Sequence, residues 1–165
     1  MRPILIALVV APVLALAAPD VGQRFPELRA EDVNGQPQTT AKFRGAKTLV
    51  VAVTDRNATE QMRQWYETAD LHLPSSVRRL SVISLELPFF IGVEMARAKA
   101  REQIPKQLWP DNLLDARGEL GERLGISGGK TPWVFALDEK GNVLARFHGP
   151  VTAPGAEAIW NALKK

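Results

Sequence analysis

A continuous apolar run, TLVVAVT at residues 48–54, constrains the fold more than any other segment of the chain. The run is rich in valine and lacks polar alternation, so it predicts a strand buried on both faces. Such strands occupy the middle of the sheet in α/β proteins. Because a helical pattern follows at once, we expect an α/β fold with this strand at its centre.

The segment that follows predicts a helix over residues 58–71. Asn57 is the expected N-cap, and Glu60 lies three residues later, close to a capping-box arrangement. Four residues recur at three- and four-residue spacings and form the predicted buried stripe: Met62, Trp65, Tyr66 and Ala69.

Turn signals and apolar patterns divide the rest of the chain into short elements. Asn34-Gly35 predicts a hairpin between strands at 28–31 and 37–40. The other predicted elements are a strand at 80–87, a helix at 89–104, a strand at 112–115, helical turns at 118–126, a hairpin of 133–137 with 143–147, and a helix at 154–164 with Ala158, Ile159 and Leu163 inward. There is no internal repeat, low-complexity tract or linker.

The first 17 of the 165 residues resemble a secretory leader. Arg2 supplies the positive start, an apolar run follows from residue 4 to 16, and Ala15-Leu16-Ala17 is an A-x-A cleavage signal. The run is shorter than the roughly 20 apolar residues needed to span a bilayer. We therefore expect cleavage after Ala17, no stable membrane span afterwards, and a single periplasmic or secreted domain over residues 18–165.

Composition excludes several classes of function. Removing Arg2 leaves 20 basic residues (21 − 1) against 18 acidic ones, interspersed along the chain, whereas nucleic-acid binding requires a concentrated basic face. His72 and His148 are isolated histidines, so no metal site is predicted. The stretch GISGGKTP at 125–132 is one residue too short for a phosphate-binding loop, and a helix precedes it. We expect no cofactor.

Three stretches, in this order, resemble the thioredoxin-like fold and its redoxin branch, which includes peroxiredoxins and exported thioredoxin-like proteins. They are VGQRFPELRAEDVNGQPQTTAKFRGAKTLVVAV (21–53), LLDARGELGERLGI (113–126) and KTPWVFALDEKGNVLARFHG (130–149). The resemblance implies a central mixed sheet flanked by helices, with an N-terminal β-hairpin and a C-terminal β-hairpin plus helix. It also implies a cis peptide bond before Pro132, facing Asn57. A fainter similarity to the exported YtfJ family lies in LWPDNLLDARGELGERLGI (108–126).

The chain departs from this family at the centre of its chemistry. Exported oxidoreductases of the family carry C-x-x-C at the strand-to-helix turn, where this chain has Asn57-Ala58-Thr59-Glu60. A peroxiredoxin would have T-x-x-C, whereas the T-x-x-N that begins at Thr54 ends in Asn57. Both reactions need a thiolate, and the chain contains no cysteine. Disulfide exchange and thiol peroxidase activity are therefore excluded for this chain acting alone.

The leading hypothesis is a polypeptide-binding or accessory protein of the cell envelope. In redox-active relatives, extended polypeptide pairs with the backbone beside the proline loop, and the same groove could hold a client or partner without reacting. Asn57, Thr131 and Pro132 would line the groove, with Asp55 and Arg56 at its rim.

Two alternatives remain open. A non-thiol enzyme would use Asp55 or Glu60 as acid or base and Arg56 to hold an anionic substrate, and a raised carboxylate pKa would favour it. A structural subunit of an envelope complex would expose an apolar face around Phe89-Phe90, although phenylalanine is more often part of the core. Helix capping alone also explains the acidic residues and the asparagine in the turn.

Overall fold

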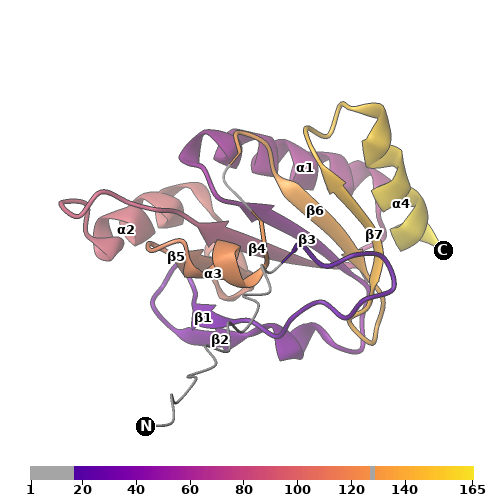
Figure 1. The fold of residues 1–165 in the computed structure, drawn as a ribbon, viewed down its shortest axis with the longest axis horizontal. Helices are drawn as coiled ribbons and strands as arrows, with labels where there is room; N and C mark the ends of the chain where they lie inside the picture. Colours follow the sequence, from indigo (N-terminus) through magenta and orange to yellow (C-terminus); the bar gives the residue numbers. More distant parts are fainter. Residues whose placement is uncertain (1–16, 127–128) are drawn as a thin grey trace, which may run out of the picture.

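The computed structural model describes residues 17–126 and 129–165, and Figure 1 shows their arrangement. The predicted leader, apart from Ala17, lies outside these residues, as do two positions of the glycine-rich stretch at 125–132. The strands are β1 (Arg29–Glu31), β2 (Pro37–Thr39), β3 (Thr48–Val53), β4 (Arg78–Ser84), β5 (Asn112–Asp115), β6 (Trp133–Leu137) and β7 (Val143–His148). The α-helices are α1 (Thr59–His72), α2 (Val93–Gln103), α3 (Glu119–Arg123) and α4 (Glu157–Lys164).

The main sheet has five strands in the order β5-β4-β3-β6-β7. Strands β3, β4 and β5 are parallel, whereas β6 runs antiparallel to β3 and β7 antiparallel to β6. Strands β1 and β2 form a separate antiparallel hairpin. The mixed sheet with helices and two hairpins confirms the predicted fold class.

Strand β3 lies at the centre of the sheet, and all six of its residues are buried. Leu49, Val51 and Val53 belong to the apolar cluster on one face, and Val50 and Ala52 to the cluster on the other. The absence of polar alternation in the sequence is thus explained by burial on both sides.

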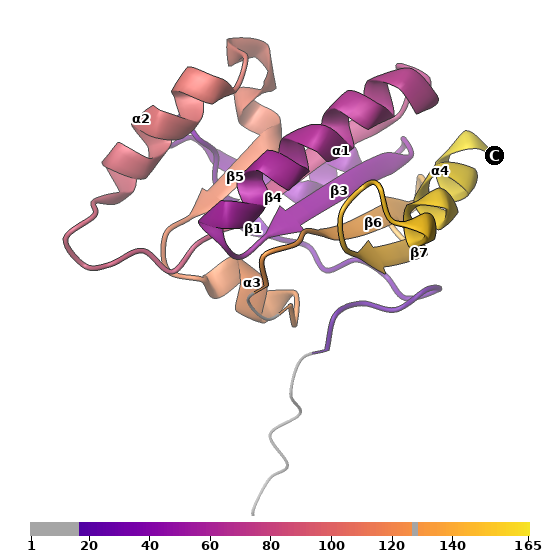
Figure 2. The same cartoon turned by 90° about the horizontal axis from the view of Figure 1, so that it is seen from above.

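Different elements cover the two faces of the sheet (Figure 2). Helices α1, α2 and α4 lie over one face, where Trp65 and Ile159 are fully buried. On the opposite face, the N-terminal segment contributes Phe25 and Leu28, and Leu120 of α3 packs beside them. The predicted hydrophobic stripe of α1 faces the side of the sheet that the three helices cover.

The N-terminal segment is bound along the outer edge of the sheet. The carbonyl oxygen of Ala18 accepts a hydrogen bond from the guanidinium of Arg146 at 3.0 Å, and Asp20 forms an ion pair with the same arginine. The amide of Gly22 donates to the carbonyl of Val143 at 2.8 Å. These contacts fix residues 18–22 against β7.

The N-terminal hairpin turns where the sequence predicts, around Asn34-Gly35. The carboxylate of Asp32, which is buried, accepts hydrogen bonds from the amides of Asn34 and Gln36 and from the side chain of Gln38. Gly35 has a φ of +77°, a conformation that favours glycine. The buried carboxylate thus adds three side-chain hydrogen bonds to the backbone pairing of the hairpin.

The helix predicted at 89–104 begins only at Val93, and the expectation that Phe89 and Phe90 belong to the core was wrong. Phe89 is fully exposed and Phe90 is 71% exposed. Both lie in a loop after Pro88, whose carbonyl accepts a hydrogen bond from the amide of Ile91 at 2.8 Å. This turn carries the two aromatic rings away from the sheet.

Smaller differences concern the ends of other elements. Strand β4 ends at Ser84, earlier than predicted, and a 3₁₀ turn over Pro154–Ala156 precedes α4. In α4, Trp160 faces inward with Ile159 and Leu163, whereas Ala158 is exposed.

Trp65 joins α1 to the end of the C-terminal hairpin. Its indole N–H donates to the carbonyl of Gly149 at 3.1 Å, and the amide of Gly149 donates to the carbonyl of Pro132 at 3.0 Å. Because Trp65 is fully buried, this chain of contacts fixes the position of the proline loop relative to α1.

We expect Trp65→Phe to lower the free energy of unfolding by about 1–3 kcal/mol more than Trp160→Phe, because it leaves the Gly149 carbonyl without its partner. Trp160 is a matched control, since it is also buried and its indole N–H makes no hydrogen bond within the described residues. Urea titrations of both variants measure the difference. Equal losses would show that the Trp65–Gly149 bond contributes nothing beyond packing.

Candidate functional site

The turn between β3 and α1 is capped by Asp55. Its carboxylate accepts a hydrogen bond from the amide of Asn57 at 2.7 Å, and its carbonyl accepts one from the amide of Ala58 at 3.0 Å. A 3₁₀ turn over Arg56–Ala58 separates this cap from α1, which begins at Thr59. The prediction that Asn57 is the N-cap was therefore wrong, because the extra turn moves the capping position two residues earlier.

The positions that would carry the two cysteines of C-x-x-C are both at the surface. Asn57 is exposed in the 3₁₀ turn, and Glu60 is exposed in the first turn of α1. Arg56, beside Asn57, is exposed as well. The fold thus keeps an accessible turn at the end of β3 but presents polar side chains there.

Glu60 has an electrostatic partner of its own. Its carboxylate pairs with Arg63 one turn later, and hydrogen bonding to that guanidinium is the main cause of the lowered pKa of Glu60. A general acid or base needs a pKa moved towards the working pH, which is the opposite direction. The geometry therefore gives no support to an acid–base enzyme that uses Glu60.

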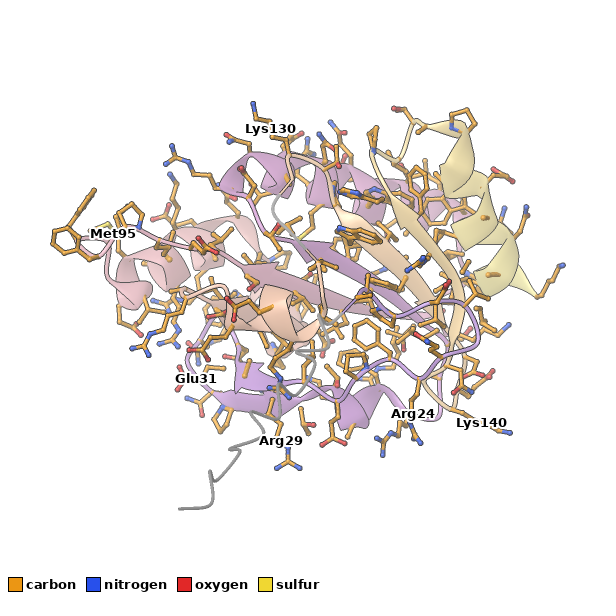
Figure 3. The ribbon with its side chains drawn as sticks, viewed as in Figure 1. Arg24, Arg29, Glu31, Met95, Lys130 and Lys140 are labelled. Atoms are coloured by element: carbon orange, nitrogen blue, oxygen red, sulfur yellow. The ribbon has the colours of Figure 1, made fainter. Side chains whose placement is uncertain are left out.

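Gln61 links the turn to the proline loop. Its side-chain amide donates to the carbonyl of Lys130 at 3.2 Å, and Figure 3 shows Lys130 on the loop beside α1. The side-chain oxygen of Gln61 is buried and has no hydrogen-bond partner within the described residues. No local pattern in the sequence marks Gln61, because its partner lies 69 residues away.

The peptide bond before Pro132 is trans, since no cis bond occurs among the described residues. The expectation of a cis bond came from the family resemblance and was wrong. Trans is the default for X–Pro bonds, by about 0.5–1 kcal/mol, unless the surroundings impose the other isomer. Here the buried Pro132 directs its carbonyl to the amide of Gly149, and the hydroxyl of Thr131 lies 3.0 Å from the ring nitrogen Nε2 of His148.

The predicted site residues therefore form two neighbouring groups. Asp55, Arg56, Asn57 and Glu60 surround the start of α1, while Thr131 and Pro132 follow the carbonyl to which Gln61 is bonded. Arg56 and Asn57 are the most accessible members, and Pro132 is buried. The backbone of this loop is partly occupied by internal hydrogen bonds, because the carbonyls of Lys130 and Pro132 are both bonded within the protein.

A hollow in the described surface lies away from these residues. It measures about 730 Å³ and lies between β1, the loop at 87–91, the start of α2 and the segment from β5 to α3. We call it the β1–α3 hollow. A second hollow, of about 30 Å³, lies near the 3₁₀ turn at 40–43. Neither is lined by any of the six predicted site residues.

Each of the two histidines stacks on a different tryptophan. His72 stacks on Trp160, with ring centres 5.5 Å apart, and His148 stacks on Trp133 at 4.5 Å. Over residues 17–126 and 129–165, no three histidine or acidic side chains are grouped as metal ligands would be. Within the same ranges, no helix has the length and apolar character to cross a bilayer.

We expect Asp55→Ala to lower the free energy of unfolding by about 0.5–2 kcal/mol, because the capping hydrogen bond is lost. Asn57→Ala should change it by less than about 0.5 kcal/mol, since the structure uses only the backbone amide of Asn57. Urea titration measures the free energy of unfolding of both variants and shows which of the two side chains caps the helix. A larger loss for Asn57→Ala would contradict the capping geometry described above.

Several solved structures resemble this chain in fold. A putative thiol:disulfide interchange protein DsbE from Chlorobium tepidum is 17% identical, with a TM-score of 0.59 over 88% of this chain and 99% of that chain. A thiol peroxidase from Chromobacterium violaceum is 15% identical, with a TM-score of 0.56 over 79% and 77%. A SCO1/SenC family lipoprotein from Bacillus anthracis str. Ames is 14% identical, with a TM-score of 0.58 over 87% and 96%.

At these identities the structural matches show a thioredoxin-like fold and no more. No curated protein matches the chain significantly. The narrower similarity to the YtfJ family stays a prediction. The model of the Redoxin family, however, matches residues 20–160, which is most of the sequence. The chain therefore belongs to the Redoxin family, as a member that has no cysteine.

Proposed function

We propose that this protein is an exported redoxin without thiol chemistry, which acts as a polypeptide-binding or accessory protein of the cell envelope. The observation that carries the proposal is the turn at the end of β3. It is built and accessible, yet it presents Arg56 and Asn57 where redox-active relatives present a nucleophilic cysteine. A site that keeps its exposure after losing its reactive group is suited to binding.

Two observations support export. The first 17 residues have the pattern of a cleavable leader. Similar solved structures also include a SCO1/SenC family lipoprotein and a putative thiol:disulfide interchange protein.

Binding at the turn over residues 55–60, which we call the inherited turn, would depend on side chains more than on backbone pairing. The carbonyl of Lys130 is bonded to Gln61, and the hydroxyl of Thr131 is in contact with His148. Arg56 offers charged donors, and Asn57 offers both a donor and an acceptor for the backbone of an extended chain. We place the contact surface at residues 55–60 and 130–133.

Export is tested by expressing the full-length chain in a Gram-negative host. The intact mass of the protein is then measured in the cytoplasmic and periplasmic fractions. We expect the periplasmic form to begin at Ala18. Replacing Ala15 and Ala17 together with arginine should leave an uncut precursor, because signal peptidase needs small residues there. Accumulation of the unmodified full-length chain in the cytoplasm would contradict export.

Polypeptide binding is tested with a reduced, alkylated and therefore permanently unfolded protein as the probe. A photo-crosslinking residue at Asn57 should capture the probe, whereas the same residue at Lys164, which is exposed on α4, should not. Arg56→Ala should weaken capture, and Arg24→Ala, at an exposed position of the N-terminal segment, should leave it unchanged.

If the probe binds nowhere at high concentration, the polypeptide-binding role is wrong. If it binds but its cross-links map away from residues 55–60 and 130–133, the role stands and the inherited turn is not its surface.

A further inference from the structure

The turn after β3 carries a short motif that polypeptide binding does not explain. Asn57-Ala58-Thr59 has the form N-x-[ST] with a residue other than proline in the middle, which is the acceptor sequence for N-linked glycans in exported proteins. We propose that Asn57 is glycosylated during export and that the glycan covers the inherited turn. This inference rests on the export in the proposed function and names a modification that regulates the same surface.

Only one of the five asparagines of the chain lies in such a motif. The residues that follow the other four are Gly-Gln, Leu-Leu, Val-Leu and Ala-Leu. Two of these four also have side chains engaged within the protein: Asn112 is buried and donates to the carbonyl of Leu108, and Asn142 donates to the carboxylate of Asp138. The single match therefore falls on Asn57, which is exposed.

The side chain of Asn57 is free to react. Its amide makes no hydrogen bond within the described residues, because the bond to Asp55 uses the backbone N–H. If Asn57 were the helix cap, its side chain would be engaged, and a linked sugar would disturb the cap. Since Asp55 caps the turn, a glycan can be attached to Asn57 without the loss of a hydrogen bond that holds the turn.

The surroundings of Asn57 can accommodate a sugar at the surface. Arg56 and Glu60, which share the inherited turn, are also exposed, and the carboxylate of Glu60 pairs with Arg63 along the helix. A glycan on Asn57 would therefore lie over these polar side chains and not against the core. It would cover the donors of Arg56 and the amide of Asn57, which are the groups proposed to contact polypeptide.

The threonine of the motif indicates when the transfer takes place. In the folded protein, the hydroxyl of Thr59 donates to the carbonyl of Arg56 at 2.8 Å. The motif requires a hydroxyl at this position, so we expect the transfer to precede the formation of α1. The topology allows this order, because β3 obtains its partner β6 only after Trp133–Leu137 has been made.

The reaction takes its glycan from a lipid-linked oligosaccharide, which is the co-substrate. The side-chain nitrogen Nδ2 of Asn57 forms a bond to the anomeric carbon of the first sugar, and the bond from that carbon to the lipid diphosphate breaks. The amide gives up one proton, and the lipid diphosphate leaves with the bonding electrons. The transfer therefore involves no oxidation or reduction, and no thiol.

The test uses the full-length chain in a bacterial host that contains an oligosaccharyltransferase, its lipid-linked oligosaccharide and a reporter glycoprotein. The intact mass of the periplasmic form should exceed that of residues 18–165 by one glycan, and the modified peptide should contain Asn57. Thr59→Ser keeps the hydroxyl and should keep the glycan, whereas Thr59→Ala and Asn57→Gln should lose it.

A second acceptor motif provides a matched control. Gln36→Thr completes the motif that begins at Asn34, in another exposed turn that also has an aspartate two residues before the asparagine. This variant should carry two glycans, and Gln36→Thr combined with Asn57→Gln should carry one. The two positions then differ in their place on the surface and not in the attached group.

The effect of the glycan on the inherited turn is measured with the reduced, alkylated probe protein. The form with a glycan on Asn57 should bind the probe about ten-fold more weakly than the unmodified chain made in a host without the transferase. A glycan on Asn34, in the double variant, should leave the affinity equal to that of Asn57→Gln.

The inference is overturned if the exported chain lacks a glycan while the reporter carries one, or if the glycan persists in Asn57→Gln. It is also overturned if the glycan on Asn57 leaves the affinity for the probe unchanged. In all three cases, binding by the unmodified chain stands. If the unmodified chain binds no probe, the polypeptide-binding role is wrong, whereas the mass still shows whether Asn57 is glycosylated, so the two failures are distinct.

Discussion

The burial of β3 on both faces is the constraint on which the rest of the structure depends. None of its six side chains reaches water, so both faces of the strand must be covered. Helices α1, α2 and α4 cover one face, and the N-terminal segment and α3 cover the other. After β3 the chain reaches the surface in the turn before α1, where side chains are exposed. The same requirement that fixes the core therefore fixes where a site can be.

The turn at that edge is built in this member of the Redoxin family without a cysteine. A helix start lowers the pKa of a cysteine because its free N–H groups favour negative charge. In this chain the negative charge at the helix start is the carboxylate of Asp55, which accepts a hydrogen bond from the amide of Asn57. Gln61 then bonds across to Lys130, which ties the turn to the proline loop without a thiol.

The sequence predicts most of the fold because its signals are local. The valine-rich run, the Asn34-Gly35 turn and the strand at 112–115 all lie where expected. The errors arise where two residues satisfy the same rule, as Asp55 and Asn57 both do for capping, or where an average preference fails, as it does for Phe89. The isomer at Pro132 was carried over from the family and not from neighbouring residues. The β1–α3 hollow was missed because it joins segments distant in the sequence, whose approach only tertiary packing determines.

The position of β6 in the sheet has a consequence for the order in which the chain can fold. Strand β3 pairs on one side with β6, so that Val51 lies opposite Val134. The central strand therefore lacks one neighbour until β6, at Trp133–Leu137, has been made. Contacts between such distant residues form slowly, because a long loop must close first. A nascent chain with this topology therefore completes the pairing of its central strand only after β6 has been made.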